Sequence, residues 1–143
     1  MTTADSDRKT PWHIWAVGTL TLLWNGSGAY TIVMAQAGRL ANIDAAEAAY
    51  YAAQPLWFVV ATDIALAAAI AAGVALLVRR RAAVWLFALS LSAIVVTNAY
   101  DLTAGSSRTL VNQGALAVTL LVATIAVLQL LYSWTMQRRA LLQ

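Results

Sequence analysis

The chain contains no cysteine, one histidine and two prolines among its 143 residues. The lack of cysteine excludes disulfide bonds and cysteine-ligated metal sites, although it leaves the cellular compartment open. One histidine cannot form a histidine-cluster metal site, and the sequence has no HExxH motif and no nucleophile–base–acid set. We therefore expect no metal, no other cofactor, and no catalysis by this chain alone.

Charge is also scarce, because charged residues make up 10% of the chain and hydrophobic residues 62%. A soluble domain usually has about 25% charged and about 45–50% apolar residues. So few charges cannot cover a water-exposed surface, which indicates that a lipid bilayer surrounds the chain. The net charge of +3 does not indicate nucleic acid as a partner, because the basic residues cluster at the ends of apolar runs.

Four apolar segments are each long enough to cross the hydrocarbon core, which takes about 20 residues in a helix. Backbone groups in lipid must be satisfied within the segment, so these segments are expected to be helices. The sequence predicts an all-α membrane protein, a single four-transmembrane-helix bundle over residues 1–143, in which residues 1–10 are disordered. The spans are expected at about residues 11–36, 55–78, 82–100 and 109–137.

The basic residues predict the orientation of these spans. In a four-span arrangement, seven of the nine fall on one side of the membrane: Arg8, Lys9, Arg79, Arg80, Arg81, Arg138 and Arg139. The other side has Arg39 and Arg108. Cytoplasmic loops carry an excess of Lys and Arg, so we expect both termini in the cytoplasm.

The connection between the first two spans is predicted to contain a short interfacial helix. Asp44 and Glu47 have the spacing of a helix capping box, with Asp44 as the cap. We expect the helix to run from about Ala45 to Gln54, with Tyr50 and Tyr51 resting on the outer membrane face.

The stretch "LWNGSGAY" places polar and small residues in the middle of the first span. Gly26 and Gly28 would let a neighbouring helix approach closely, and Asn25 would then form a hydrogen bond across the contact. We favour this structural interpretation, and ligand binding by Asn25 is the alternative.

Asp63 is expected about 12 Å into the second span. An acid at the centre of a spanning helix costs about 2.5–3.5 kcal/mol, so it should face the interior of the bundle. Neutral partners at similar depth are Asn25, Tyr30 and Thr31 of the first span. Asn98 of the third span is expected somewhat higher, and Asn112 and Gln113 near the outer end of the fourth. Two interpretations stay open: a hydrogen-bonded cluster that locks the helices, or a polar cavity for a small solute, a proton or a quinone-like headgroup.

The second span also has Ala65, Ala69 and Gly73 at four-residue spacing. Such ridges of small residues bring helices into close contact, within one chain or between chains. Packing within the chain is the favoured interpretation, and a homo-oligomer is the alternative.

The segments "PWHIWAVGTLTLLWNGSGAYTIVMAQ", "YYAAQPLW" and "LLVRRRAAVWLFALSLS" resemble a family of small bacterial four-span proteins with a DoxX-like layout. Members of this group are sometimes tagged as sugar transporters. The resemblance implies a bacterial inner-membrane protein. In the family an acid follows the Gly-Ala-aromatic element, where this chain has Thr31, and Asp63 would take over its role.

The sequence therefore predicts a non-enzymatic inner-membrane protein. It would act as an accessory subunit of a larger membrane complex, or as a small-solute binder that uses the polar cluster in the outer half of the bundle. One alternative is a transporter of a sugar-like solute that works as an oligomer. Another is the membrane subunit of a quinone-linked redox system.

Overall fold

The computed structural model describes residues 11–41, 43–103 and 113–142, and these are helical with no strand among them. The predicted disorder of residues 1–10 and the predicted helix at residues 109–112 lie outside this part. The five helices are α1 (Trp12–Gln36), α2 (Ala45–Ala52), α3 (Leu56–Leu77), α4 (Ala82–Thr103) and α6 (Gln113–Arg138).

Local chemistry explains where α2 begins and where α3 follows it. The Asp44 carboxylate accepts a hydrogen bond from the Glu47 backbone N–H at 2.7 Å, which is the N-cap half of the predicted capping box. The short helix ends at Ala52, two residues before the predicted Gln54. Pro55 then precedes α3 in an extended conformation, so it stands just before the helix, where its missing N–H costs nothing.

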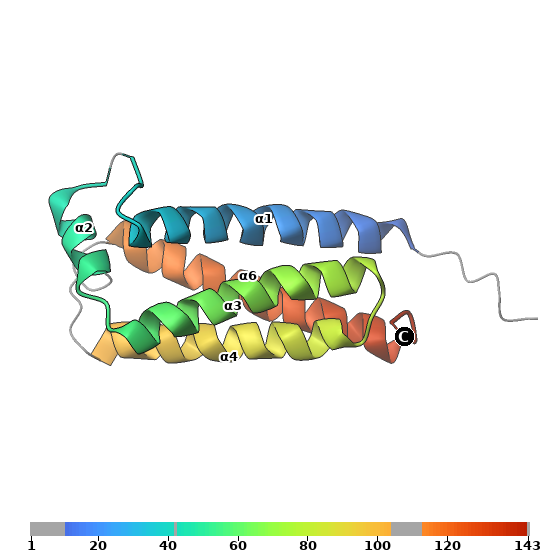
Figure 1. Cartoon of the computed structure of the whole chain (residues 1–143). Helices are drawn as coiled ribbons and strands as arrows, with labels where there is room; N and C mark the ends of the chain where they lie inside the picture. Colours follow the sequence, from blue (N-terminus) through green and yellow to red (C-terminus); the bar gives the residue numbers. More distant parts are fainter. Residues whose placement is uncertain (1–10, 42, 104–112, 143) are drawn as a thin grey trace, which may run out of the picture.

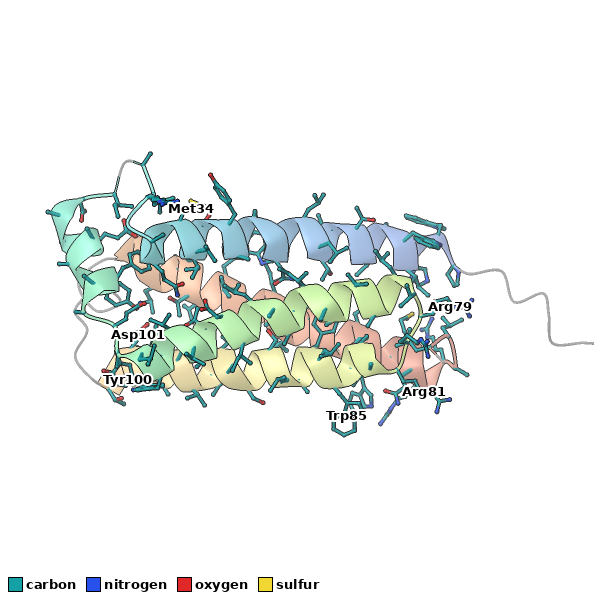
Figure 2. The ribbon with its side chains drawn as sticks, in the orientation of Figure 1. Met34, Arg79, Arg81, Trp85, Tyr100 and Asp101 are labelled. Atoms are coloured by element: carbon teal, nitrogen blue, oxygen red, sulfur yellow. The ribbon has the colours of Figure 1, made fainter. Side chains whose placement is uncertain are left out.

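The four long helices run alongside one another, and α2 lies across one end (Figure 1). Close packing joins α1 to α3, α3 to α4, and α4 to α6. Figure 1 also shows that α1 begins, α3 turns into α4, and α6 finishes at the opposite end. We call this opposite end, with Arg79–Arg81 and Arg138–Arg139, the arginine end, and the other the α2 end (Figure 2).

Within the described residues, three helices are long and apolar enough to cross a membrane: α3, α4 and the Leu116–Arg138 part of α6. The fourth long helix, α1, has 25 residues but is not among them. Its centre carries Asn25, Gly26, Ser27 and Gly28, which reduce its mean hydropathy. The described chain is thus a membrane-type helical protein with three apolar candidate spans.

The apolar core gathers at the arginine end. Its buried members come from four helices and the last residues of the described chain: Ile14, Ala72, Ala75, Leu76, Ala83, Phe87, Met136 and Leu142. The chain reverses after α6 at Ala140, whose φ is +55°, and this places Leu142 inside the core. The Arg79 and Arg81 Nε–H groups donate to the backbone carbonyls of Leu141 and Leu142 at 3.0 and 3.4 Å.

Small residues set the distance between α1 and α3. Ala65 and Ala69 are buried, and a Cβ added to Gly73 would stand 2.8 Å from Leu22 Cδ2. A Cβ added to Gly18 would likewise collide with the Leu77 side chain. The ridge of small residues on α3 is therefore buried within one chain, and Gly73 packs directly against α1.

Gly26 and Gly28 do not have the packing role expected of them. A Cβ built on either glycine would meet nothing within 4 Å, so no neighbouring helix approaches closely there. The glycines at which α1 and α3 approach closely are Gly18 and Gly73, nearer the arginine end, whereas Gly28 borders a cavity between the helices.

Candidate binding cavity

A cavity of about 430 Å³ lies in the half of the molecule nearer the α2 end. Residues from all five helices line it, together with Gln54 of the connection between α2 and α3. Its volume falls within the range of about 300–1,000 Å³ that small-molecule sites occupy. Its polar lining residues are Asn25, Ser27, Thr31, Gln36, Tyr50, Tyr51, Gln54, Thr62, Ser90, Thr97, Asn98, Asp101 and Thr119. We call it the polar cavity.

One polar wall belongs to α4. The lining residues Ser90, Ile94, Thr97, Asn98 and Asp101 recur at intervals of three and four residues, which places them on one face of the helix. The Thr97 hydroxyl donates to backbone carbonyls of its own helix at 3.1 Å. The Asn98 carboxamide makes no hydrogen bond within the described part of the chain, so its donors and acceptor are available to water or a solute in the cavity.

The facing wall belongs to α1. The Asn25 amide donates to the Thr21 carbonyl of the same helix at 2.9 Å, so it does not form the expected bond across a helix contact. The Ser27 and Thr31 hydroxyls also donate to carbonyls of α1, at 2.8 and 3.0 Å. These bonds use the hydroxyl donors of Ser27 and Thr31, whereas the Asn25 amide keeps a second N–H, and the side-chain oxygen atoms are left as acceptors beside the cavity.

Tyr50 joins α2 to the end of α4. Its hydroxyl is 3.0 and 2.9 Å from the two carboxylate oxygens of Asp101, to which it donates. Tyr50 and Tyr51 are half-buried and line the polar cavity, whereas the sequence predicts them on the outer membrane face. No residue of α2 is fully buried, yet its two tyrosines reach this cavity.

Aromatic rings support this end from the other side of α4. The ring of Tyr100 stacks edge-on against Trp57 with centroids 4.8 Å apart, and it contacts Phe58 at 5.6 Å. Phe58 is buried and also lines the polar cavity. These contacts fix the last turn of α4 against the first turn of α3, and so they position Asp101.

Asp63 is the main departure from the expected site. Its side chain lies on the exposed face of α3 and does not line the polar cavity. The preceding residue, Thr62, does line it. Successive residues of an α-helix differ by about 100° around the axis, so one position in sequence separates the inward threonine from the outward acid.

The remaining expected residues are divided. Asn25 and Asn98 line the polar cavity together, whereas Tyr30 is 65% exposed and does not. Gln113 is the first residue of α6, but its side chain lies outside the described part. Of the four cluster members whose side chains are described, the structure therefore brings two together at the cavity.

Asp101, Tyr50, Thr62 and Gln54 belong to the cavity but were not expected there. A signal for Asp101 exists in the sequence, because it follows Ser90, Thr97 and Asn98 on a single helical face. It was missed because the third span was expected to end at residue 100, and α4 continues to Thr103. No comparable pattern marks Tyr50 or Gln54.

The charge of the polar cavity limits what it can hold. Asp101 is acidic, and none of the described lining residues is lysine, arginine or histidine. Hydroxyl and amide groups supply the other polar contacts, and Trp24, Phe58 and Ile94 are among the apolar surfaces. This lining suits a neutral or cationic polar molecule and disfavours an anion.

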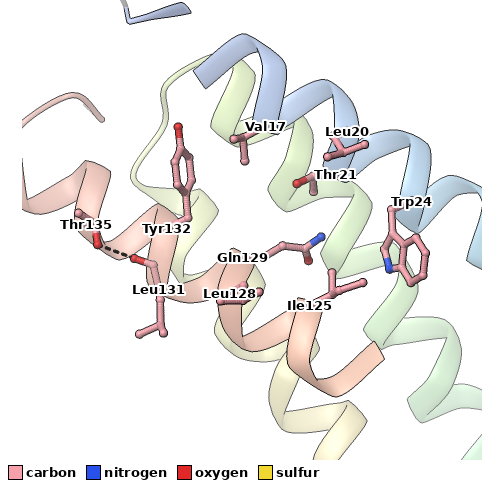
Figure 3. A pocket seen from close by; sticks show the side chains of 10 residues that line it. All are labelled: Val17, Leu20, Thr21, Trp24, Ile125, Leu128, Gln129, Leu131, Tyr132 and Thr135. Carbon is pink, nitrogen blue, oxygen red and sulfur yellow. Dashed lines mark hydrogen bonds between the residues drawn. The ribbon is translucent and has the colours of Figure 1, made fainter. Parts of the chain in front are cut away.

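A second hollow, almost entirely apolar, lies between α1 and α6 (Figure 3). It has a volume of about 590 Å³ and is bounded mainly by Val17, Leu20, Ile125, Leu128 and Leu131. We call it the apolar cleft.

The polar groups at its walls are few. Gln129 extends from α6 into the space between the two helices (Figure 3). Nearer the arginine end, the Tyr132 hydroxyl and His13 Nδ1 are hydrogen-bonded at 2.6 Å, which links α6 to the start of α1. Trp24 lines both the apolar cleft and the polar cavity.

Comparison with protein families, with curated proteins and with solved structures finds no match for this chain.

Proposed function

We infer that this protein is a multi-pass membrane protein that binds a small neutral or cationic polar solute in the polar cavity. The observation that carries the proposal is a cavity of about 430 Å³ in which hydroxyl and amide groups of several helices converge. A polar cavity among membrane helices must contain water or a ligand, because unsatisfied polar groups are costly in an apolar medium. The protein would work alone or as an accessory subunit of a larger complex, without catalysis.

The proposed topology has α1 as a fourth span and both termini in the cytoplasm. Its support is that α1 has 25 residues and packs along α3, which is itself apolar enough to span. The described basic residues also favour it, since five arginines stand at the arginine end and Arg39 near the other. In a bacterial inner membrane the polar cavity would then lie in the outer half. Membership of a DoxX-like family is part of this proposal and rests on the sequence segments alone.

Ligand-induced stabilisation tests the proposed function. The purified protein in lipid nanodiscs would be heated with single compounds from three sets of similar size: neutral polyols and sugars, organic amines, and carboxylate or phosphate anions. A solute at 100 times its Kd stabilises the folded state by about 2.7 kcal/mol. We expect a neutral or amine compound to raise Tm, and no anion to do so.

Two variants of α4 locate the binding. Asn98→Ala removes a carboxamide that lines the cavity, whereas Ser92→Ala changes an exposed residue of the same helix. The shift in Tm should disappear in the first variant and persist in the second. An unchanged response of Asn98→Ala, or stabilisation only by anions, would contradict the proposal.

A second candidate, the quinone-linked subunit, is favoured by the apolar cleft. Trp24 borders both hollows, so a molecule with a polar headgroup and an apolar tail could use the two together. Leu128→Trp would fill part of the cleft. It should weaken binding of a long-tailed quinone in nanodiscs while leaving tail-less polar solutes unaffected, and equal binding of the quinone to both proteins would exclude this candidate.

A further inference from the structure

A continuous stripe along α3 faces away from the rest of the chain. Its exposed members include Leu56, Val60, Asp63, Ala67, Ala71 and Val74, which recur at intervals of four, three, four, four and three residues. Residues at such intervals share one face of a helix. The buried ridge of Ala65, Ala69 and Gly73 occupies a different side and packs against α1.

Asp63 is the single charged member of this stripe, and it has no partner. It makes no hydrogen bond or ion pair with the described residues. It is the eighth residue of α3 and lies about 10 Å from the start of that helix at 1.5 Å per residue. Long side chains such as lysine and arginine can reach the membrane surface from such a depth, but a carboxyl on a single methylene cannot.

An acid on the lipid side of a spanning helix is costly, and acidic residues within spans nearly always face protein or water. The helix here is apolar enough to span, yet within the described part of the chain the Asp63 side chain is exposed. Ala67 and Ala71 follow at one and two turns, and side chains this small allow another helix backbone to approach closely. The stripe therefore has both a polar group that requires a partner and a surface on which a helix fits.

We propose that this face of α3 is the interface with a second copy of the same chain, in which the two Asp63 carboxyl groups hydrogen-bond across a twofold axis. A neutral carboxyl group carries one donor and one acceptor, so it is complementary to an identical group. A twofold axis along the membrane normal relates the two copies, so it places their two Asp63 carboxyl groups at the same depth in the membrane. An unrelated partner would need its own polar group at that depth. The proposal rests on the membrane placement of α3 and is independent of what the polar cavity binds.

Cysteine cross-linking tests this interface, because the natural chain has no cysteine. Ala67→Cys would place a thiol in the stripe. Ser92→Cys would place one at an exposed position near the middle of α4, as a control at similar depth. Each purified variant would be treated with a short thiol-specific cross-linker in proteoliposomes at high lipid-to-protein ratio. We expect a covalent dimer with Ala67→Cys and none above background with Ser92→Cys.

Substitutions of Asp63 in the Ala67→Cys background test the role of the carboxyl group. Asp63→Leu should lower the dimer association constant by about 5- to 30-fold, because a polar contact between helices in lipid contributes about that factor in model peptides. Asp63→Asn retains a donor and an acceptor and should keep most of the dimer. Both variants should fold, since Asp63 makes no hydrogen bond or ion pair with the described residues that either change would remove.

Three outcomes would overturn the proposal: no dimer with Ala67→Cys, equal cross-linking of Ser92→Cys, or an unchanged dimer in Asp63→Leu. The ligand-induced shift in Tm is measured separately, so a failure of the dimer leaves the solute-binding proposal standing, and the reverse also holds.

Discussion

The two ends of the molecule use similar apolar helices but pack them in different ways. At the arginine end, helices meet through small residues, and Phe87 and Leu142 fill the space between them. At the α2 end the same helices enclose a cavity lined by asparagine, threonine and tyrosine. Stability is not uniform across a protein, and binding regions are drawn from its less stable parts. The comparison indicates that packing at the arginine end provides most of the stability of the helix bundle. The α2 end can therefore be packed less closely and contain a cavity.

Matched phenylalanine truncations should give the largest difference between the two ends. Phe87 and Phe58 are 2% and 5% exposed, but Phe58 borders the polar cavity. Phe87→Ala leaves a void in a close-packed region, and we expect a loss of about 2–3 kcal/mol. This is below the 3–5 kcal/mol of water-soluble proteins, because lipid removes much of the transfer contribution.

Phe58→Ala should cost about 1 kcal/mol, because its ring already has empty space on one side. The free energy of unfolding in mixed micelles measures both changes. Equal losses at the two positions would show that the α2 end is packed as tightly as the other.

Substitutions of two glycines of α1 compare how closely the helix is packed near the arginine end and near its middle. A side chain at Gly18 would collide with Leu77, so Gly18→Leu should destabilise the fold by about 1–3 kcal/mol through overpacking. Gly26 has nothing within 4 Å of an added Cβ, and leucine is a better helix former than glycine. Gly26→Leu should therefore be neutral or stabilising by up to about 1 kcal/mol. Denaturant titration of the two variants checks this, and a loss at Gly26 as large as at Gly18 would contradict it.

The link between α2 and α4 should be local in its effect. Tyr50→Phe removes the two hydrogen bonds to Asp101, which we expect to contribute about 1 kcal/mol. Hydrogen exchange of the α2 amides should then accelerate about fivefold, while exchange in the core of α3 stays the same. Tyr30→Phe serves as the control for losing a hydroxyl, because the Tyr30 side chain is 65% exposed on α1. A uniform acceleration over all helices would show that the α2 end is not an independent unit.

The smallest expected effect concerns the turn after α6. Ala140 has a φ of +55°, and its turn bonds Leu141 N–H to the Met136 carbonyl at 3.1 Å. Glycine adopts this conformation without the penalty of about 1 kcal/mol that other residues carry. Ala140→Gly should raise the free energy of unfolding by about 0.5–1 kcal/mol, as measured by thermal or denaturant unfolding, whereas destabilisation would show that the Ala140 methyl packs usefully.

Much of the helical layout could be predicted from the sequence, because it depends on local chemistry. Segment length, the prolines and the Asp44 cap each act within a few residues, and the helices begin and end close to the predicted positions. The side of a helix on which each side chain lies, facing the bundle or facing outward, was harder to predict. Asp63 was expected to face inward because an acidic side chain in contact with lipid costs free energy. That cost applies to the complete membrane assembly and not to one isolated chain. A single chain can therefore expose the acid where a partner helix covers it. Tyr50 was misplaced because its contact with Asp101 joins residues 51 positions apart.

The position of α1 has a mechanical consequence. Along its length it packs on α3, whereas it faces α6 across the apolar cleft, and it supplies a wall to both hollows through Trp24. A small rotation of α1 about α3 would change the widths of both hollows at once while α3, α4 and α6 stay together. Under the proposed function, acyl chains in the apolar cleft and a solute in the polar cavity would then be energetically coupled. Bilayer composition becomes a variable that any affinity measurement on this protein has to hold fixed.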